Sequence, residues 1–356
     1  MSRADIVNSD KVSLFNLRGD QNPQVSFVQK AFRVLLYYIR LIKYAARSDS
    51  KLFHIQWFNK FLLFDRTLLN LYYKFLGKRL VFTAHNIDEQ QRDGNKNILN
   101  QLSLKILYNL VDHIFVHTIK MKEELIQDFN IKVNKVTVIP FGINNTLPRT
   151  HSTRADARNA LGLQDYHKIL LFFGNIAPYK GLEDLVTAAV HLRERDDSYR
   201  VIIAGQVKNC RSYWRNLKQA INAHELNKYI TARTEYVPDH EVEMYFKCAD
   251  VLVLPYKFIY QSGVLFLSYS FGLPVIASDV GSLREDIIEG KTGFICNPND
   301  PDDLAEKIDV YFNSDLFRSL EKYRTEIIRY ANEKHSWTTV AEKTYAVYRN
   351  LLGSSA

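Results

Sequence analysis

Short apolar runs alternate along the chain with longer segments in which apolar residues recur every three or four positions. The short runs predict buried strands, and the longer segments predict amphipathic helices. In the first part of the chain this pattern predicts strands at 11–17, 52–57, 79–83, 112–116 and 135–140 and helices at 25–46, 62–76, 100–110 and 121–128. Uniformly apolar strands that alternate with helices are typical of a parallel sheet covered on both faces.

A second alternating set follows a polar, non-periodic segment at 145–166. Its predicted strands are 169–173, 200–204, 230–232, 251–254, 275–277 and 293–296, and its predicted helices are 181–193, 213–224, 239–249, 264–271, 282–289, 301–312, 314–333 and 338–352. The predicted fold class is therefore α/β, with two Rossmann-like, doubly wound domains facing a cleft. The predicted boundaries are a first domain at 1–148, a linker at 149–166, a second domain at 167–336 and a final helix at 337–356.

Composition agrees with a globular protein of two domains. The chain has 356 residues, of which 46% are hydrophobic and 24% charged, which argues against disorder. Its three cysteines, Cys210, Cys248 and Cys296, have no CxxC spacing, so neither a disulfide framework nor a zinc site is indicated. No membrane span and no signal peptide is visible, and a reducing cytoplasm is the predicted location.

Positive charge gathers in the first part of the chain. Residues 1–150 contain 22 Lys and Arg against 12 Asp and Glu, whereas residues 151–356 contain 25 against 27. Such asymmetry indicates an anionic partner: nucleic acid, anionic lipid or a phosphorylated substrate. The helix at 25–46 carries interleaved basic residues, and is either a surface helix with a solvated basic face or a helix lying on an anionic bilayer. No nucleic-acid-binding pattern is present, so nucleic acid is not predicted as a partner.

Two glycine-containing loops follow predicted strands and open helices. The first runs from Gly174 to Gly181 and includes Lys180, and the second includes Ser262, Gly263 and Val264. Small residues at a helix N-terminus let backbone N–H groups approach a phosphate, and a lysine adds a point charge. The Walker A pattern is absent. These loops predict a phosphate-binding site at the carboxyl ends of the second sheet.

The collinear order of motifs resembles the group-1 glycosyltransferases, also called glycosyltransferase family 4. The segments that carry the resemblance are LFHIQW, TAHN and HTIKMKEEL in the first domain and GNIAPYKG, IIAG, YVPDHEVEMYFKCADVLVLPY, SGV, FGLPVIASDVGSLRE and EGKTGFICNPNDPDDLAEKI in the second. The resemblance covers about residues 50 to 352.

That resemblance implies the GT-B architecture and an activity. Members transfer a sugar from a nucleotide-sugar, here UDP- or GDP-linked, to an acceptor, usually with retention and without a bound metal. The family donor sits mainly on the second domain and the acceptor on the first, with the final helix packing back on the first domain. A glycan or lipid-linked acceptor, polysaccharide or glycolipid biosynthesis and a hexosyltransferase are expected. No cofactor or metal ligand is expected, because the nucleotide-sugar is a co-substrate.

The resemblance assigns donor-side roles by position. Lys180 matches the lysine that neutralises the donor diphosphate, which lowers the barrier as charge grows on the leaving group. The other donor-side candidates are Gly174, Asn175, Arg233, Val237, Ser262, Gly263, Val264 and Glu285. Asn175 stands where many relatives carry a second cation, an arginine.

On the acceptor side the resemblance points to histidines. His85, in TAHN, matches a position that faces the sugar and is, with Lys180, the expected catalytic pair. Acceptor-side candidates are His54, Gln56, Asn86 and His117. No general base is nominated, because in a retaining enzyme the leaving phosphate can take the acceptor proton.

Two further departures weaken the match. Two glutamates common in relatives correspond here to Ile259 and Leu267, which have no carboxylate to bind the ribose. The usual opening strand and glycine-rich loop have no counterpart, since Gly19 is the only glycine in the first 76 residues. Reduced activity is therefore one expectation, and the alternative function is a non-catalytic nucleotide-sugar-binding or scaffold subunit. The inner face of the cytoplasmic membrane is a further predicted location.

Overall fold

The computed structural model describes residues 12–19, 22, 24–59, 61–88, 97–143, 145–150, 152–208 and 210–353. The chain divides into two compact units, each described below by itself. The smaller unit comprises residues 1–83, 102–114 and 347–356, and the larger unit comprises residues 84–101 and 115–346. The domain boundaries given above stay a prediction.

The first sheet has the strand order β1-β2-β3-β4 within the described residues. Its strands are β1 (Leu52–Ile55), β2 (Arg79–Thr83), β3 (His113–Val116) and β4 (Val136–Val138). β1 and β2 pair in parallel, with His54 opposite Val81. Every residue of β3 and all of β2 after Arg79 is buried, as the uniformly apolar runs predict.

The strand predicted at 11–17 is wrong. Lys11 lies outside the described residues, and residues 12–19 contain no strand. Val12, Leu14 and Phe15 are exposed. An alternating run becomes a strand only where a neighbouring strand completes its hydrogen bonds and a core covers its apolar face, and these side chains have no such cover.

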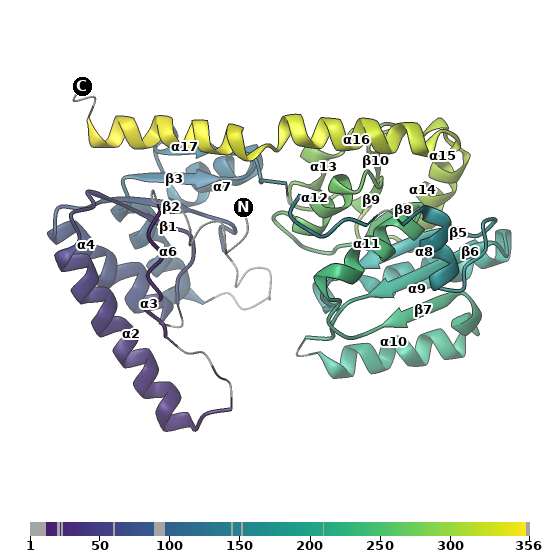
Figure 1. The fold of residues 1–356 in the computed structure, drawn as a ribbon, viewed down its shortest axis with the longest axis horizontal. Helices are drawn as coiled ribbons and strands as arrows, with labels where there is room; N and C mark the ends of the chain where they lie inside the picture. Colours follow the sequence, from purple (N-terminus) through teal and green to yellow (C-terminus); the bar gives the residue numbers. More distant parts are fainter. Residues whose placement is uncertain are drawn as a thin grey trace. The chain divides into compact units, whose positions relative to one another are not determined.

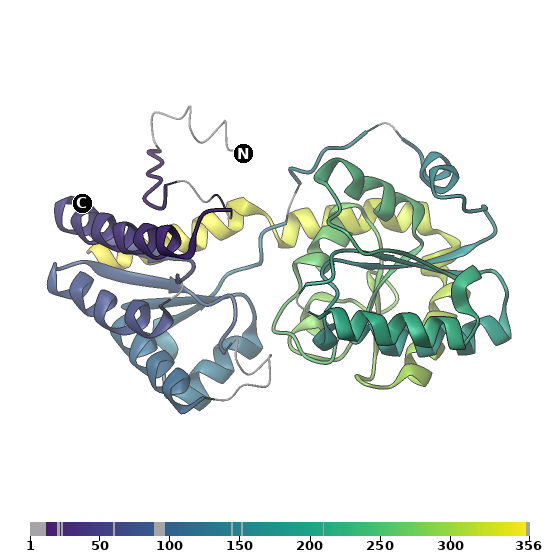
Figure 2. The ribbon, with the colours of Figure 1, turned by 90° about the horizontal axis from the view of Figure 1, so that it is seen from below.

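Two of the helices that accompany this sheet begin at residues whose side chains cap them. The helices are α2 (Phe27–Arg47), α3 (Leu62–Phe64), α4 (Asn70–Phe75), α6 (Ile98–Leu110) and α7 (Ile119–Phe129). Ser26 begins α2 with a capping box, and the Thr118 side chain accepts from the Met121 N–H at the start of α7. α2 lies beside α4 in both views (Figures 1 and 2), and the Tyr72 hydroxyl donates to the Ile42 carbonyl at 3.2 Å.

The helix predicted at 62–76 is interrupted by a π-helical segment, Asp65–Leu69. The Asn70 amide donates to the carbonyls of Asp65 at 3.0 Å and Arg66 at 3.3 Å. The Asp65 carboxylate accepts from the Asn59 backbone N–H at 2.8 Å. These side-chain bonds replace part of the regular backbone ladder, which a periodicity pattern does not reveal.

The second sheet is parallel and has six strands among the described residues, in the order β10-β9-β8-β5-β6-β7. They are β5 (Lys168–Phe173), β6 (Tyr199–Ala204), β7 (Ile230–Arg233), β8 (Val251–Leu254), β9 (Val275–Ser278) and β10 (Gly293–Cys296). Strand order reverses between β5 and β8, which are neighbours. Ligands of such sheets bind beyond the carboxyl ends of the strands at this reversal.

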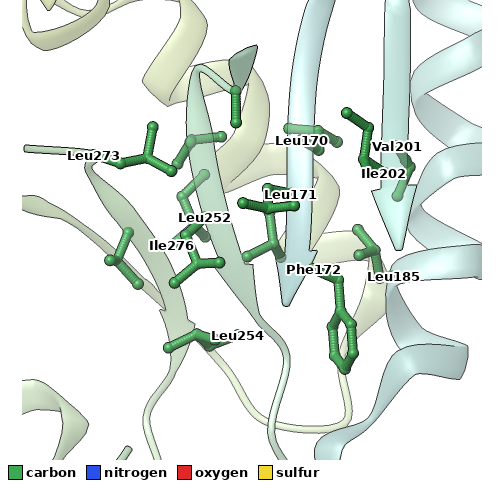
Figure 3. Close-up of a cluster of buried hydrophobic side chains, with 14 of the residues drawn as sticks. Leu170, Leu171, Phe172, Leu185, Val201, Ile202, Leu252, Leu254, Leu273 and Ile276 are labelled. Atoms are coloured by element: carbon green, nitrogen blue, oxygen red, sulfur yellow. The ribbon is translucent and has the colours of Figure 1, made fainter. Parts of the chain in front are cut away.

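Aliphatic side chains on both faces of this sheet form the core of the larger unit. Figure 3 shows Leu170, Leu171 and Phe172 from β5 between the side chains of β6 and β8. These three side chains have no exposed surface. The burial explains why the strands read as continuous apolar runs and why the loops at their ends are held firmly.

The helices of the larger unit agree with the pattern except at three places. They are α8 (Arg154–Ala160), α9 (Leu182–Arg195), α10 (Arg211–Ala223), α11 (Asp239–Cys248), α12 (Gly263–Ser270), α13 (Leu283–Asp286), α14 (Pro301–Asn313), α15 (Asp315–Arg318), α16 (Leu320–Lys334) and α17 (Trp337–Leu352). α8 lies inside the predicted linker, where Thr153 and Asp156 form a capping box. α13 is shorter than predicted, and the helix predicted at 314–333 is divided at Ser319.

The segment after β4 is tied to the junction between α16 and α17. The Ile143 N–H donates to the His335 carbonyl at 3.0 Å, and the Trp337 indole donates to the Ile143 carbonyl at 3.0 Å. A Cβ on Gly142 would lie 2.5 Å from the Trp337 ring, so only glycine allows this approach. The start of α17 is therefore held against residues that follow β4.

Candidate functional site

The loops after β5 and β8 meet at the reversal of strand order. Gly181 ends the first loop with a φ of +60°, and a Cβ there would lie 1.9 Å from the Pro255 carbonyl oxygen. Gly174 begins the loop with a φ of +103°, and its carbonyl lies against Gly205. Gly181 and Gly205 are needed because a neighbouring backbone approaches too closely for a side chain, and Gly174 is favoured by its positive φ. The two loops therefore form one rigid edge at the predicted ligand position.

Lys180 lies inside this edge and is only 6% exposed. Its Nζ lies 5.1 Å from the centre of the Tyr256 ring and 6.0 Å from that of Phe172. A Cβ on Gly174 would lie 3.1 Å from the same Nζ. Among the described residues no carboxylate forms an ion pair with Lys180. A buried ammonium held by aromatic rings and lacking a protein anion is suited to bind an anionic ligand.

The N-terminus of α12 faces the same place. A Cβ on Gly174 would lie 3.3 Å from Cγ2 of Val264, next to the lysine. The Ser262 side chain does not cap the helix, and the Leu265 N–H donates to the Ser262 carbonyl at 3.1 Å, so the N–H groups of Gly263 and Val264 are the ones offered to a ligand. Ser262 is buried, and its hydroxyl lies 3.5 Å from that of Tyr256. The structure thus brings together Gly174, Lys180 and the predicted loop at 262–264.

His85 and His117 form a pair near this helix. Nε2 of His117 lies 2.9 Å from Nδ1 of His85, and their ring centres are 5.0 Å apart. Burial, reinforced by the neighbouring His85 ring, lowers the pKa of His117 to about 4. His117 is therefore neutral at physiological pH, and one ring of the pair can donate a proton to the other or to a ligand hydroxyl.

Phe141 connects the histidine pair with α12. Its ring centre lies 5.2 Å from that of His117, and it stacks on Phe266 at 5.0 Å with an interplanar angle of 12°. A Cβ on Gly263 would lie 3.7 Å from Cζ of Phe141. The start of α12 and His117 thus both lie against the Phe141 ring, within the larger unit.

Three predicted donor-side residues are engaged elsewhere. Both carboxylate oxygens of Glu285 accept from the backbone N–H groups of Ile119 and Lys120 at 3.1 Å, where they stabilise the start of α7. Arg233 pairs with Glu241 and donates to the Tyr245 hydroxyl at 3.3 Å, and this pairing raises the pKa of the guanidinium. Val237 is buried in the hydrophobic core.

The remaining candidates are placed as follows. Asn175 is exposed, and Asn86 is half-buried beside His85. His54 and Gln56 belong to the smaller unit, where Nε2 of His54 lies 2.7 Å from the Thr83 hydroxyl and 3.0 Å from the Gln56 amide. Nδ1 of His54 also contacts the Tyr348 hydroxyl of α17. His54 therefore joins β1 to the end of the chain.

The two positions that lack glutamate are apolar contacts. Ile259 and Leu267 are half-buried and pack against the core of the larger unit. Gln261, between them, donates to the Asp286 carboxylate at 3.4 Å, while its Oε1 is buried and accepts no hydrogen bond from the described residues. This amide oxygen can accept from a ligand hydroxyl near the loop at 262–264.

Sequence reasoning missed the aromatic and acidic groups around the site. Tyr256 is fully buried beneath Lys180, and only its place directly after β8 gave a signal. The Tyr260 hydroxyl donates to Glu124 at 3.1 Å and accepts from the Asp88 N–H at 3.3 Å. Burial raises the pKa of the Glu124 carboxyl. In the described ranges no group of three His, Cys, Asp or Glu side chains is placed to hold a metal ion.

Family models match most of the chain. Residues 153–334 match the model of the glycosyl transferases group 1, and residues 12–147 match the model of glycosyltransferase family 4. An uncharacterised glycosyltransferase of Methanocaldococcus jannaschii is 29% identical over 232 residues, which cover 64% of this chain and 57% of that protein. A D-inositol 3-phosphate glycosyltransferase of Corynebacterium diphtheriae is 24% identical over 283 residues, which cover 76% of this chain and 64% of that protein. The chain thus spans less than two thirds of these relatives.

Solved structures of similar fold cover nearly all of the chain. The Anabaena protein HepE, in complex with UDP and glucose, has a TM-score of 0.74 at 16% identity and covers 92% of this chain and 84% of its own. Sucrose-phosphate synthase of Thermosynechococcus elongatus has a TM-score of 0.70 at 21% identity. The match covers 93% of this chain and 81% of that one. At these identities the likeness concerns the fold alone, and it confirms the predicted GT-B architecture.

Proposed function

The chain belongs to the glycosyl transferases group 1 family, and we propose that it transfers a sugar, with retention, from a UDP- or GDP-linked donor to a glycan or lipid-linked acceptor. The observation that carries the proposal is Lys180, a buried cation beside the N-terminus of α12 with no ion pair to a described residue. A diphosphate placed there would meet both the ammonium group and free backbone N–H groups.

The chemistry follows from charge. When the sugar leaves, negative charge grows on the terminal phosphate of the nucleotide. Lys180 is already desolvated and held by Tyr256, so it can stabilise this charge without reorganisation. The N–H groups of Gly263 and Val264 would contribute in the same direction. In a retaining reaction the leaving phosphate can accept the acceptor proton, so the proposal requires no protein general base.

The histidine pair is proposed to hold sugar hydroxyls. His117 is neutral because its pKa is about 4, so its ring can position His85 without adding charge. His85 is half-buried and can therefore reach a ligand. Asn86, its neighbour in sequence, offers both a donor and an acceptor. Relatives named as D-inositol 3-phosphate glycosyltransferases support a phosphorylated acceptor, as does the basic first part of the chain.

A second function has specific support. The positions of the missing glutamates hold Ile259 and Leu267, both half-buried against the core, and Glu285 is bound to the start of α7. A donor held without these carboxylates could be bound and not turned over. The second candidate is therefore a non-catalytic nucleotide-sugar-binding or scaffold subunit.

One experiment separates the two functions. Isothermal titration with a panel of UDP- and GDP-sugars first identifies the donor, and release of the nucleotide is then measured with and without polyprenyl-phosphate-linked and free glycan acceptors. Binding followed by acceptor-dependent release supports the transferase. Binding without release by the protein, under conditions where a family transferase turns over, supports the subunit. Absence of binding to any donor contradicts both.

The proposed place of action is the cytoplasmic side of a membrane. No described helix is long and apolar enough to cross a bilayer. Association through a surface of the protein is argued next.

A further inference from the structure

Helix α2 leaves most of its apolar side chains uncovered. It has 21 residues, of which only Tyr38 and Ala45 are buried. Exposed apolar residues recur along it at intervals of three and four and so share one face. They are Val28, Phe32, Leu35, Ile39 and Ile42, with exposed fractions of 74%, 59%, 57%, 39% and 36%. We call these five residues the α2 stripe.

Basic residues adjoin the α2 stripe. Within the α2 sequence there is no Asp or Glu, whereas Lys30, Arg33, Arg40, Lys43 and Arg47 are all basic. Arg40, Lys43 and Arg47 are exposed and follow the same spacing on the face next to the stripe. An apolar stripe bordered only by cations is typical of helices that lie on anionic membranes.

The buried face of α2 fixes its orientation on the smaller unit. Tyr38 packs against Phe61 and Phe64, with ring centres 5.7 Å and 5.4 Å away. The Asn59 amide also donates to the Tyr37 hydroxyl at 2.7 Å. The stripe lies on a different face of α2 from Tyr38 and Ala45. These contacts therefore hold α2 on the smaller unit and leave the stripe uncovered. The neighbouring helix α4 adds the exposed side chains Leu71 and Phe75.

We propose that the α2 stripe lies in the interfacial region of a bilayer that contains anionic lipid. Charge complementarity selects this occupant. A second copy of the chain would bring a second helix with five cations and no acidic side chain against the first, which is unfavourable. A helix of this length can lie about 30 Å along a surface, and it buries apolar side chains while its arginines and lysines contact headgroups. The role of the surface, to bring the chain to a lipid-linked acceptor, rests on the proposed function.

The test is flotation of the full chain with vesicles of phosphatidylcholine alone or with about one third phosphatidylglycerol. Flotation with the anionic vesicles is expected. The stripe variant Phe32→Glu/Ile39→Glu should bind at least about tenfold more weakly, because both side chains would insert charge into the interface. The matched control Tyr166→Glu/Val310→Glu adds the same charge at exposed apolar positions of the larger unit and should float as the wild type does.

A second variant tests the charges. Arg40→Gln/Lys43→Gln/Arg47→Gln should weaken anionic binding on the order of 100-fold, since each basic residue contributes roughly fivefold at an anionic surface. Circular dichroism and titration with the donor nucleotide check that each variant is folded and retains donor binding. Donor binding is independent of flotation, so failure of this inference and failure of the proposed function are distinguishable.

Three results would overturn the inference. One is no flotation of the wild type with anionic vesicles. Another is equal flotation of the stripe variant and its control. The third is a concentration-dependent dimer in light scattering that the stripe variant abolishes, because it would identify a second copy as the occupant.

Discussion

Burial distinguishes Lys180 from the other lysines to which a phosphate-binding role could be assigned. Its ammonium group is separated from water, lies over the Tyr256 ring and forms no ion pair with the described residues. Such a charge is costly unless an anion compensates it. The sequence placed this lysine after a strand and a glycine, but its contact with the Tyr256 ring depends on a residue more than seventy positions away.

Replacement of Lys180 tests this role directly. Lys180→Met keeps the length and apolar stem of the side chain and removes the charge. We expect kcat/KM for nucleotide release to fall about 100- to 1000-fold, because one stabilising group at the developing charge is lost. The control is Lys322→Met, an exposed lysine of α16, which should leave kcat/KM unchanged. If both variants had equal kcat/KM, Lys180 would have no role in the reaction.

His117 predicts a pH dependence of stability. Its pKa is about 4 when folded against an ordinary value of 6.5, because burial disfavours the charged ring. Between these values the unfolded chain binds the proton and the folded chain does not, so the free energy of unfolding falls as pH decreases from 6.5 to 4. Above pH 6.5 this histidine has no effect on the pH dependence.

The measurement is urea unfolding of the wild type and of His117→Gln across this pH range. The difference between them should change by up to about 1.4 kcal/mol per pH unit. Buried Asp286, whose pKa of about 6 is raised by burial, acts with the opposite sign in both proteins and therefore cancels in the difference. A difference that stays constant across this range would contradict the lowered pKa of His117.

Elements of the larger unit are held together where backbones touch without side chains. Gly181 stands between the loop after β5 and the start of α9, in contact with Pro255 after β8. The sequence indicated a turn at this glycine. The contact with a loop that lies far along the chain could not be predicted, because it depends on the strand order, in which β5 and β8 are neighbours.

Alanine substitutions at two glycines of similar backbone conformation distinguish the cost of backbone strain from the cost of a steric clash. Gly181→Ala would place a Cβ 1.9 Å from a carbonyl oxygen, whereas Gly162, with a φ of +67°, has open space around its Cβ position. Gly162→Ala should cost about 1–2 kcal/mol from backbone strain alone. Gly181→Ala should cost more than about 4 kcal/mol, measured by urea unfolding, and should weaken donor binding. If the two substitutions lowered the free energy of unfolding by similar amounts, the loops after β5 and β8 would be able to move apart easily.

At the scale of the whole molecule, the predicted ligand belongs to the larger unit. The described phosphate-site candidates, Lys180 and the loop at 262–264, lie entirely within it. Binding to the folded state alone stabilises the part of the molecule that must be intact for binding. The two units should therefore respond differently to a nucleotide.

Hydrogen exchange measures this difference. With UDP or GDP at about 100 times its Kd, amides at 174–181 and 262–265 should exchange up to about 100-fold more slowly. Amides of β1 and β2 in the smaller unit should be unchanged. The variant Lys180→Met should abolish the protection. Equal slowing in both units would contradict placement of the nucleotide in the larger unit alone.

The alternation of apolar runs and amphipathic segments by itself determined the α/β class, most strand positions and the loops that follow them. A strong period of apolar residues indicates which side chains are buried, and these strands and helices all bury apolar side chains. Local patterns failed where partners decided the outcome, as at residues 12–17, which lack a neighbouring strand, and at Asp65–Leu69, where Asn70 widens the helix. Three further features depend on the packed fold: Glu285 stabilises the start of α7, Tyr256 lies beneath Lys180, and α2 leaves its apolar face open. These are contacts between residues distant in the chain, and their free energies depend on packing that no local sequence window contains.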